Sequence, residues 1–401
     1  MNRRIMPIMS ALLMAAMLLM VGANGAMVSA RAEAGVKAPL ESEVPFELSC
    51  ASALLLEAST GREIFALNAD ERRPVASVNK LMPILLILEA LESDRCALND
   101  MVTVSRRAEG MGGSQALLDA GASYELSELF KSVIVGSAND STVALGEYLY
   151  GSEEGMVAAM NRRAAELGMN DTCFVNSTGL PAQGHYTTAR DIARLSREVI
   201  SHEAYFEYST IWLDELKHPS GRVTQLTNTN RLTRLYDGCD GIKTGSTNEA
   251  GFCMSASAMR GDMRLIAVVL GAPSSKERFA DASALLDHGF ANYSMHTAAR
   301  RGDIVERGFP VIGGDPQQVD IVLDGDCVTL IERGGAADIR LERTLPDALS
   351  APLTAGQVVG SVRVMLGERV LREIDAVVAQ DVNVRGLGEG VRRVLRLWFY
   401  M

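Results

Sequence analysis

The sequence predicts an α+β fold in two domains, the first mixed and the second all β. Residues 50–296 contain a predicted hairpin, a mainly helical stretch and two core strands, whereas residues 297–384 contain short β-prone runs between turns. The 401 residues suffice for two domains with a large core. An apolar content of 47% and a charged content of 22% are those of an ordinary globular protein.

The first 32 residues are interpreted as a secretory signal peptide. Two arginines precede an apolar run at residues 5–21, and Ala30 and Ala32 supply small side chains at the two positions that a signal peptidase reads. Cleavage is expected after Ala32, because the apolar run is too short for a permanent membrane anchor. Residues 33–49 then form an extended leader.

Charge and cysteine content exclude several classes of function. The formal charge is −11, and it becomes −14 once the three arginines of the signal peptide are removed, so no nucleic-acid partner is expected. The cysteines show no Cys-x-x-Cys spacing and have no histidine cluster beside them, so no zinc site is expected. Cys239 and Cys253 flank a predicted hairpin and are the first candidates for a disulfide. The six cysteines are Cys50, Cys96, Cys173, Cys239, Cys253 and Cys327.

A predicted hairpin leads directly into a helix that begins near Ser77. Residues 52–57 and 63–67 are short apolar runs joined by a turn that contains Gly61. Residues 80–91 are apolar on nearly all sides, which predicts a helix buried in the middle of its domain. Lys80 therefore lies at the start of a core helix, where burial would lower its pKa.

A polar interruption separates two helical stretches in the region of residues 101–168. The segment Ser137-Ala138-Asn139-Asp140-Ser141 stands between an apolar helical stretch and the helix that resumes at residues 142–150. Such an interruption can be only a helix cap or turn, and that structural interpretation stays open. Further helices are predicted at residues 156–167 and from Thr187 onward.

Two core strands follow at residues 251–258 and 264–271, and they are predicted to pair antiparallel. The polar segment 240–246, with Lys243-Thr244-Gly245 at its centre, is expected on a neighbouring strand. An alternative is a solvated lysine at a sheet edge and a glycine at a close backbone approach. A helix at residues 285–293 is expected to close the domain.

The end of the chain has a different character. Residues 297–384 are predicted to form a small all-β domain, and residues 385–401 a terminal amphipathic helix. Arginines on one side of that helix and apolar residues on the other favour a position in a membrane interface. A helix docked on its own domain is the alternative. The apolar side comprises Leu387, Val391, Leu395 and Trp398, and the basic side Arg392, Arg393 and Arg396.

Three short motifs occur in order along the first domain, and the predicted structure around each would let all three contribute to a single active site. They are Ser77-x-x-Lys80 at a helix start, Ser137-x-Asn139 between helices, and Lys243-Thr244-Gly245 on a strand. Ser77 and Lys80 share one face of the first helical turn, so the amine can reach the hydroxyl. A serine becomes a nucleophile when a base takes its proton, and a lysine can act as that base if it is kept neutral. Each motif alone is weak, but together they predict nucleophilic catalysis.

With these motifs, residues 53–293 resemble the low-molecular-mass penicillin-binding proteins, specifically the serine D-alanyl-D-alanine carboxypeptidases. Other matching segments carry the resemblance too. It implies a serine β-lactamase/transpeptidase-like fold, an antiparallel sheet with a helical subdomain, and no cofactor. It also implies a peptidoglycan pentapeptide substrate, β-lactams as covalent inhibitors, and a place on the outer face of the cytoplasmic membrane. The further segments that carry the resemblance are Gly113-Ser114, Met160-Asn161, Leu167-Gly168-Met169, Gly179-Leu180, His185-Tyr186-Thr187-Thr188-Ala189 and Asp240-Gly241-Ile242.

The resemblance implies catalytic roles for residues of the first two motifs. Ser77 would attack the penultimate D-alanine carbonyl and form an acyl-enzyme, with Lys80 as the base. Ser137 would relay a proton to the leaving amine, and Asn139 would hold the substrate amide or orient Lys80. The backbone amides of Ser77 and Ser246 would form the oxyanion hole.

The remaining candidates would bind the terminal carboxylate of the substrate. Lys243 and Thr244 would supply a cation and a hydroxyl, and Gly245 would let the strand backbone approach. Arg278 resembles an arginine that some family members place near that carboxylate, although a surface arginine of a helix is an equal alternative.

Two departures from the family pattern concern the Ser77 helix. Asn79 and Pro83 stand where the family commonly has threonines. A proline at position 83 is tolerated only if the helix has barely begun, because it cannot donate to the carbonyl four residues earlier.

Two other functions remain as alternatives. A β-lactamase shares all three motifs, and Glu166-Leu167-Gly168-Met169-Asn170 approximates the pattern that positions its deacylating water. We interpret that match as a coincidence. A catalytically inert protein that binds the cell wall is the second alternative. A Ser-His-Asp hydrolase is poorly supported, because the chain has five histidines and no Gly-x-Ser-x-Gly elbow.

Overall fold

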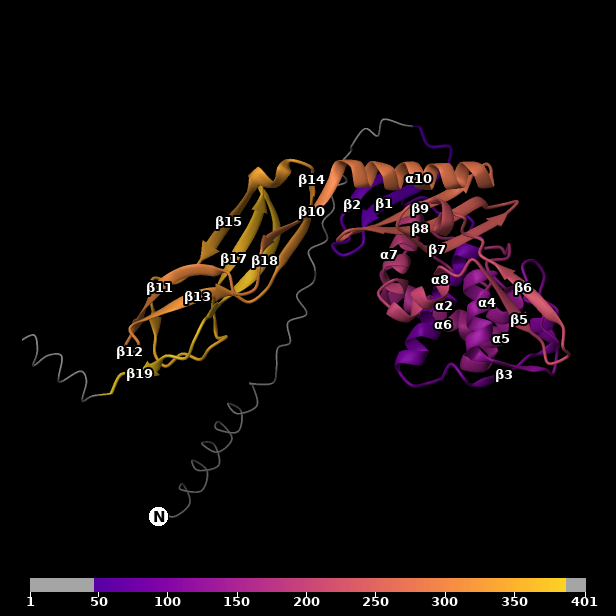
Figure 1. Ribbon diagram of the computed structural model, residues 1–401, viewed down its shortest axis with the longest axis horizontal. Coiled ribbons are helices and arrows are strands. Elements are labelled where there is room, and N and C mark those ends of the chain that lie inside the picture. Colours follow the sequence, from indigo (N-terminus) through magenta and orange to yellow (C-terminus); the bar gives the residue numbers. More distant parts are fainter. Residues whose placement is uncertain (1–46, 387–401) are drawn as a thin grey trace, which may run out of the picture. The chain divides into compact units, whose positions relative to one another are not determined.

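The computed structural model describes residues 47–386 (Figure 1). Residues 1–46 and 387–401 lie outside the described residues. They include the predicted signal peptide, nearly all of the leader and nearly all of the predicted terminal helix. Within residues 47–386, no helix is both long enough and apolar enough to cross a membrane.

A five-stranded antiparallel sheet forms the centre of the first domain, in the order β2-β1-β9-β8-β7. The predicted hairpin and the two predicted core strands are confirmed. The segment with Lys243 is a strand, β7, and it lies at one edge of the sheet. The strands are β1 (Ser52–Glu57), β2 (Glu63–Leu67), β7 (Cys239–Thr247), β8 (Gly251–Arg260) and β9 (Met263–Ala272).

Both faces of this sheet are covered by helices, which explains its apolar strands. Leu54 and Leu56 of β1 pack into the core that contains α2 (Leu81–Glu92), whereas Leu55 packs with residues of α10 (Ser275–Asn292). Successive side chains of a strand point to opposite faces, so β1 contributes to both cores. Figure 1 shows α10 on one side of the sheet and the other labelled helices on the opposite side.

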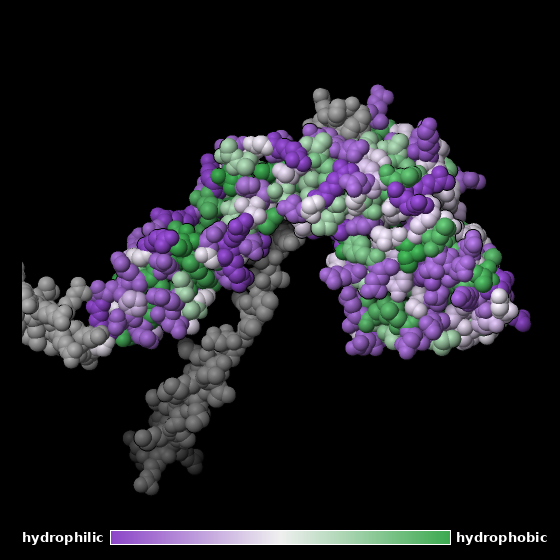
Figure 2. Space-filling view, viewed as in Figure 1, coloured by the Kyte–Doolittle hydropathy of each residue, from purple (hydrophilic) through white to green (hydrophobic). Residues whose placement is uncertain are grey.

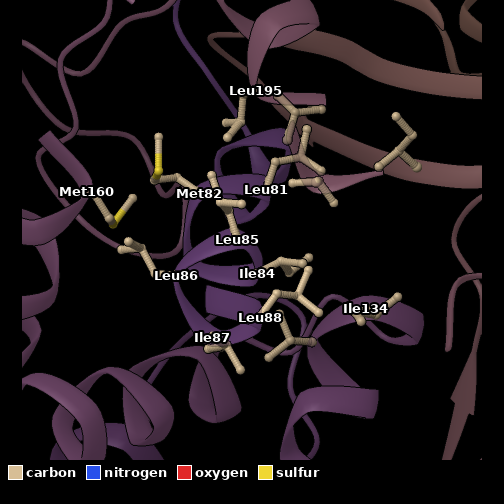
Figure 3. Close-up of a cluster of buried hydrophobic side chains, with 14 of the residues drawn as sticks. Leu81, Met82, Ile84, Leu85, Leu86, Ile87, Leu88, Ile134, Met160 and Leu195 are labelled. Atoms are coloured by element: carbon tan, nitrogen blue, oxygen red, sulfur yellow. The ribbon is translucent and has the colours of Figure 1, made fainter. Parts of the chain in front are cut away.

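The helix predicted at Ser77 begins as one turn of 3-10 helix, η1 (Ser77–Lys80), and continues as α2. This start accommodates Pro83, because the residue lies in the first turn of α2, where a backbone donor is not required. Nine of the twelve residues of α2 are buried. Figure 3 shows its leucine and isoleucine side chains pointing outward on several sides into one apolar cluster. The prediction of a buried core helix is therefore confirmed.

The helical part of the first domain agrees with the predicted order of elements. An interruption separates α4 from α5, as expected, but it is shorter than predicted, because α5 begins at Asn139 and not at Thr142. Two short two-stranded sheets, β3-β4 and β5-β6, were not predicted. The remaining helices are α3 (Arg106–Glu109), α4 (Leu126–Val135), α5 (Asn139–Tyr150), α6 (Glu153–Glu166), α7 (Ala189–Val199), η2 (Glu203–Tyr205), α8 (Phe206–Ser209) and α9 (Leu232–Leu235); the strands of the two short sheets are β3 (Met101–Thr103), β4 (Ser123–Glu125), β5 (Leu213–Lys217) and β6 (Val223–Thr227).

The region after α10 is all β apart from one short turn of helix, as the sequence predicts. Its main sheet has the order β15-β17-β18-β13-β11-β16, and β10 pairs with β14. The predicted domain limits, 50–296 and 297–384, remain a prediction. The elements are β10 (Tyr293–Ala299), β11 (Ile304–Ile312), β12 (Gly314–Asp315), β13 (Gln318–Leu323), β14 (Cys327–Glu332), η3 (Gly335–Asp338), β15 (Ile339–Thr344), β16 (Leu349–Ser350), β17 (Val358–Leu366), β18 (Arg369–Val378) and β19 (Asn383–Val384).

On the face seen in Figure 2, hydrophilic residues alternate with small apolar patches. A surface of that kind is ordinary for a globular protein, because polar residues never cover the whole exterior.

Two predictions need correction. The closing helix, α10, begins at Ser275 and is ten residues longer at its start than predicted, because Ser274 caps it by accepting a hydrogen bond from the Glu277 amide. The prediction of a disulfide between Cys239 and Cys253 is wrong, because both thiols are free. In the register of the sheet Cys253 lies opposite Gly245, six residues along β7 from Cys239. That offset is about 20 Å, far beyond the Cα separation that a disulfide spans.

Candidate active site

Ser77 and Lys80 lie on the same 3-10 turn, with the amine directed at the hydroxyl. The Lys80 Nζ lies 3.0 Å from the Ser77 Oγ and also donates to the Thr178 carbonyl at 2.7 Å. The Lys80 side chain is completely buried. The pKa of its amine is held well below the usual value, mainly because burial disfavours the charge and secondly because Lys243 carries a like charge. The predicted effect on Lys80 is therefore confirmed, and the site contains a base beside a hydroxyl.

Ser137 and Asn139, the residues of the second motif, each have one buried polar atom that is unsatisfied among residues 47–386. The Ser137 Oγ and the Asn139 Oδ1 are buried, and neither has a hydrogen-bond partner among the described residues. Ser137 also has a φ of +59°, which is uncommon for a residue other than glycine. Asn139 uses its Nδ2 to donate to the Gly112 carbonyl at 2.6 Å, so its Oδ1 is left to accept from a further donor.

Asp140 fixes the loop that carries Gly112 beside Asn139. Its carboxylate accepts hydrogen bonds from the backbone amides of Ala116 and Leu118, at 2.9 and 3.1 Å. It also opposes the lowering of the Lys80 pKa, because its negative charge favours a protonated amine. The loop and the polar turn are thus held together by a buried carboxylate that sequence analysis did not single out.

Strand β7 presents Lys243 and Thr244 at the sheet edge. The Lys243 side chain is 1% exposed, and its Nζ donates to the Thr244 carbonyl at 3.2 Å. Burial and the nearby Arg278 lower the pKa of the Lys243 amine to about 7. The Thr244 Oγ1 donates to the Thr229 Oγ1 at 2.7 Å. Lys243 and Thr244 thus combine an amine that titrates near neutrality with a hydroxyl already oriented by Thr229.

Gly245 brings β7 into direct contact with the start of the Ser77 turn. A Cβ added at this position would lie 2.5 Å from the Ser77 amide nitrogen and 2.8 Å from that of Val78. Any side chain would therefore push the strand away from the turn. Ser246 follows at an exposed position of the same strand. The close backbone approach named in the alternative interpretation is thus present, but the solvated lysine of that interpretation is not, because Lys243 is buried.

Arg278 is not a surface arginine. Its guanidinium is buried and donates to the carbonyls of Gly245 and Cys253 at 3.2 and 3.3 Å. Burial lowers its pKa to about 10. Arg278 therefore supports the back of β7. It also lines a cavity of about 360 Å³ together with Trp212, Thr227, Asn228, Thr229, Arg231, Ser275 and Phe279.

Several contributors carry no signal that sequence analysis could use. The Thr178 carbonyl that accepts from Lys80 is a backbone group, and Thr229 reaches the site from a loop before α9. His185 reaches the Asn79 Oδ1 with its Nε2 at 2.9 Å beneath the Ser77 turn. Burial lowers the His185 pKa to about 4, so the ring is neutral there. The family pattern contained His185, but only the fold assigns it this contact.

One group of possible metal ligands occurs among residues 47–386, formed by Glu89, Glu198 and His202. Arg163 lies between the two carboxylates and donates to each at 2.7 Å. The positive guanidinium offsets part of the negative charge and occupies an oxygen of each carboxylate, so the arrangement does not favour a metal ion there. A larger cavity of about 740 Å³ lies between β4 and β5, and none of the motif residues lines it.

Strand β7 touches the Ser77 turn at Gly245, and the charge of Asp140, next to Asn139, acts on the Lys80 amine, so segments of all three motifs lie around Lys80. A serine hydroxyl with a buried lysine as its neighbour, beside a cationic sheet edge, defines a serine acyl-transfer enzyme. Comparison with known proteins extends this class to a family. Residues 37–274 match the family model for D-alanyl-D-alanine carboxypeptidase, Peptidase_S11, and the chain belongs to this family. Residues 293–384 match the model for the C-terminal domain of penicillin-binding protein 5.

Individual relatives agree with the family match. The chain is 36% identical over 348 residues to the D-alanyl-D-alanine carboxypeptidase DacF of Bacillus subtilis, covering 86% of this chain and 89% of the relative. Identity to DacC of Escherichia coli is 34% over 343 residues, covering 83% and 84%. The structure of penicillin binding protein 5 from Haemophilus influenzae aligns with a TM-score of 0.72 at 29% identity, covering 87% of this chain and all of that one.

These findings decide between the functions left open by the sequence. The chain is a serine-type D-alanyl-D-alanine carboxypeptidase, with a transpeptidase-like first domain. Neither a β-lactamase nor an inert wall-binding protein is supported. Glu166, the residue that resembled a β-lactamase glutamate, is exposed at the end of α6 and pairs with Arg163 at 3.4 Å. It does not contact the Ser77 turn, so the interpretation of a coincidence stands.

Replacing Gly245 with alanine is expected to lower the rate of acylation by about 10- to 100-fold, because the new methyl group displaces β7 from the Ser77 turn. The rate constant for covalent labelling by penicillin, followed by mass spectrometry, measures the effect. Gly335→Ala is the matched control, because a Cβ at Gly335 meets nothing within 4 Å. Equal rates for Gly245→Ala and the unaltered protein would contradict the importance of this approach.

Proposed function

We propose that Ser77 is the acylated nucleophile and that the substrate is a peptidoglycan pentapeptide ending in D-alanyl-D-alanine. The observation that carries this proposal is the 3.0 Å contact between the Ser77 Oγ and a completely buried Lys80 amine. The family supports the reaction, and this contact supports Ser77 as the residue on which it takes place. Ser77 attacks the carbonyl of the penultimate D-alanine, and water later releases the shortened peptide.

Lys80 is the proposed base of acylation. The lowered pKa makes the neutral amine available, and the amine lies within hydrogen-bond reach of the hydroxyl whose proton it takes. The tetrahedral intermediate then carries a negative oxygen. The backbone amides of Ser77 and Ser246 are proposed to stabilise that oxygen, and the approach of Gly245 to the Ser77 amide supports this pairing.

Ser137 is proposed to act on the nitrogen of the scissile bond, and Asn139 on another amide of the substrate. The unpartnered Ser137 Oγ relays a proton to the leaving amine. The free Asn139 Oδ1 accepts a hydrogen bond from a substrate N–H, because its Nδ2 is already used by Gly112. Among the two roles expected for Asn139, this contact favours holding the substrate over orienting Lys80.

The terminal carboxylate of the substrate is proposed to bind at β7. Lys243 offers a cation and Thr244 a hydroxyl, and the backbone of Gly245 and Ser246 lies alongside them. Arg278 adds positive potential from behind the strand, where it holds the Gly245 carbonyl. Arg278 would therefore assist carboxylate binding in two ways, by holding β7 in place and by supplying positive charge.

A β-lactam is expected to acylate the same serine. The structure of penicillin-binding protein D2 from Listeria monocytogenes was determined in its ampicillin-bound form, and it aligns with a TM-score of 0.55 at 31% identity, covering 61% of this chain and 99% of that one. We infer that this chain reacts with penicillins through Ser77 in place of the peptide carbonyl.

The direct test is to incubate the protein with a peptide that ends in D-Ala-D-Ala and to follow the release of D-alanine. Release is expected from the unaltered protein, together with a long-lived penicillin adduct whose mass maps to Ser77. Ser77→Ala should abolish both. Ser201→Ala, at an exposed serine after α7, is the matched control and should keep both activities. Rapid hydrolysis of penicillin, or no release and no adduct, would refute the proposal.

The pH dependence of kcat/KM should report the loss of the positive charge on Lys243. Its charged form attracts the substrate carboxylate, and its pKa of about 7 means that this charge is lost as the pH rises. We therefore expect kcat/KM for a peptide with a free carboxylate to fall above about pH 7. In Lys243→Arg the charge persists, so the falling limb should move to higher pH even if the maximum is lower. A falling limb at the same pH in both proteins would contradict this assignment.

We further propose that the protein acts outside the cytoplasm, on the outer face of the cytoplasmic membrane. The support is the sequence pattern of the signal peptide (1–32) and of the amphipathic segment (385–401), both outside or nearly outside the described residues. In a bacterial host, the mature protein should begin at Glu33 and fractionate with membranes. Trp398→Glu should release it, whereas Leu235→Glu, at an exposed residue of the first domain, should not. Membrane association of the Trp398→Glu protein would contradict the proposed anchor.

A further inference from the structure

A buried glutamate outside the three motifs lies one contact away from the loop that holds Lys80. Glu153 is the first residue of α6 and is 6% exposed. Its Oε1 accepts hydrogen bonds from the Ser177 amide at 3.3 Å and from the Ser177 Oγ at 3.1 Å. Its Oε2 lies 2.6 Å from the Arg107 Nη2. Both carboxylate oxygens of Glu153 are thus paired, one with Ser177 and the other with Arg107.

The next residue of that loop carries the acceptor for the proposed base. The Thr178 carbonyl accepts from the Lys80 Nζ at 2.7 Å, and the same nitrogen donates to the Ser77 Oγ. Glu153 is therefore linked to the nucleophile through Ser177, the Thr178 carbonyl and Lys80. A shift of the Ser177 backbone would move the Thr178 carbonyl and with it the position of the amine.

Internal hydrogen bonds and close packing hold the loop at residues 176–179, so a displacement at Ser177 would also move Thr178. The Asn176 Oδ1 accepts from the amides of Thr178 and Gly179 at 3.2 and 2.7 Å, which closes the turn. Gly179 has a φ of +82°, and a Cβ there would lie 2.2 Å from the Ala76 carbonyl oxygen. The loop is thus pressed against the residue that precedes Ser77, and within residues 47–386 the acidic side chain that anchors it is Glu153.

Glu153 also connects the two sides of the site. Arg107 belongs to α3 (Arg106–Glu109), directly before the loop whose Gly112 carbonyl accepts from Asn139. A buried carboxylate is costly unless it is paired and hydrogen-bonded, and Glu153 meets this requirement only while both segments stay in place. Its position at the N-terminus of α6 further favours the negative charge.

We propose that Glu153 is a positioning residue that sets the Thr178 carbonyl, and through it the Lys80 amine, for acylation of Ser77. The inference rests on the proposed role of Lys80 as the base. It deepens that role by naming what holds the base in place. Glu153 itself does not touch the substrate, because Ser177 and Thr178 stand between it and Lys80.

The test compares the second-order rate constant of penicillin acylation across pH in the full-length protein. Glu153→Ala is expected to lower this constant by about 10- to 100-fold at neutral pH. Release of the loop admits water to Lys80, whose pKa is lowered mainly by burial, so the rising acid limb should move to higher pH. A residue that only stabilised the fold would leave that limb where it is.

Three further variants keep the test decisive. Glu154→Ala is the matched control, because Glu154 is an exposed neighbour that pairs with the same Arg107 at 2.7 Å but does not reach Ser177. It should leave the rate and the limb unchanged. Glu153→Gln keeps an acceptor for Ser177, and Ser177→Ala keeps the amide contact, so both should show smaller shifts in the same direction. These two variants decide the question if Glu153→Ala does not fold.

An unchanged acid limb in the folded Glu153 and Ser177 variants, with only a lower melting temperature, would overturn this inference while leaving the proposed function intact. Failure of the unaltered protein to be acylated would instead overturn the proposed function, and the inference with it. A shift of the limb in Glu153→Ala but not in Glu154→Ala supports the positioning role.

Discussion

The site depends on two buried amines that have no carboxylate to pair with in the described chain. Lys80 and Lys243 are almost completely enclosed, and each donates to a backbone carbonyl rather than to an acid. Burial of a charge without a counterion is costly, so both amines are shifted toward the neutral form. The apolar helix α2, the loop at Thr178 and strand β7 together exclude water. A base and a titratable cation result from enclosure rather than from any unusual side chain.

A close meeting of helix and sheet makes this enclosure possible. The 3-10 turn lets the chain enter α2 with Pro83 in its first turn, and the absence of a side chain at Gly245 lets β7 touch the Ser77 amide. Arg278 holds the back of the same strand through the Gly245 carbonyl. The position of the nucleophile therefore depends on backbone packing, and the side chains are added to a geometry that the backbone has already set.

The parts of the molecule that could be predicted from sequence are those encoded locally. The hairpin before Ser77, the buried helix after it and the strand at Lys243 follow from short-range patterns of apolar and turn residues, and all were confirmed. Each catalytic motif spans at most four residues, so its spacing was visible as well. Register was not visible, which is why the proposed cysteine pair failed although both residues do lie on one hairpin.

Long-range contacts made through the backbone escaped prediction for a different reason. The Thr178 carbonyl that holds Lys80 exists at every residue of any chain, so no side chain marks it. Glu153 lies before the helix predicted at residues 156–167, and only the fold shows that it begins α6 and is buried against Ser177. The left-handed backbone of Ser137 has a consequence of another kind. A strained residue with an unsatisfied hydroxyl at the heart of the site means that the protein is less stable than its fold would permit. Selection of variants for heat resistance alone would therefore favour glycine or a less polar residue there, and would remove the hydroxyl that we propose as the proton relay.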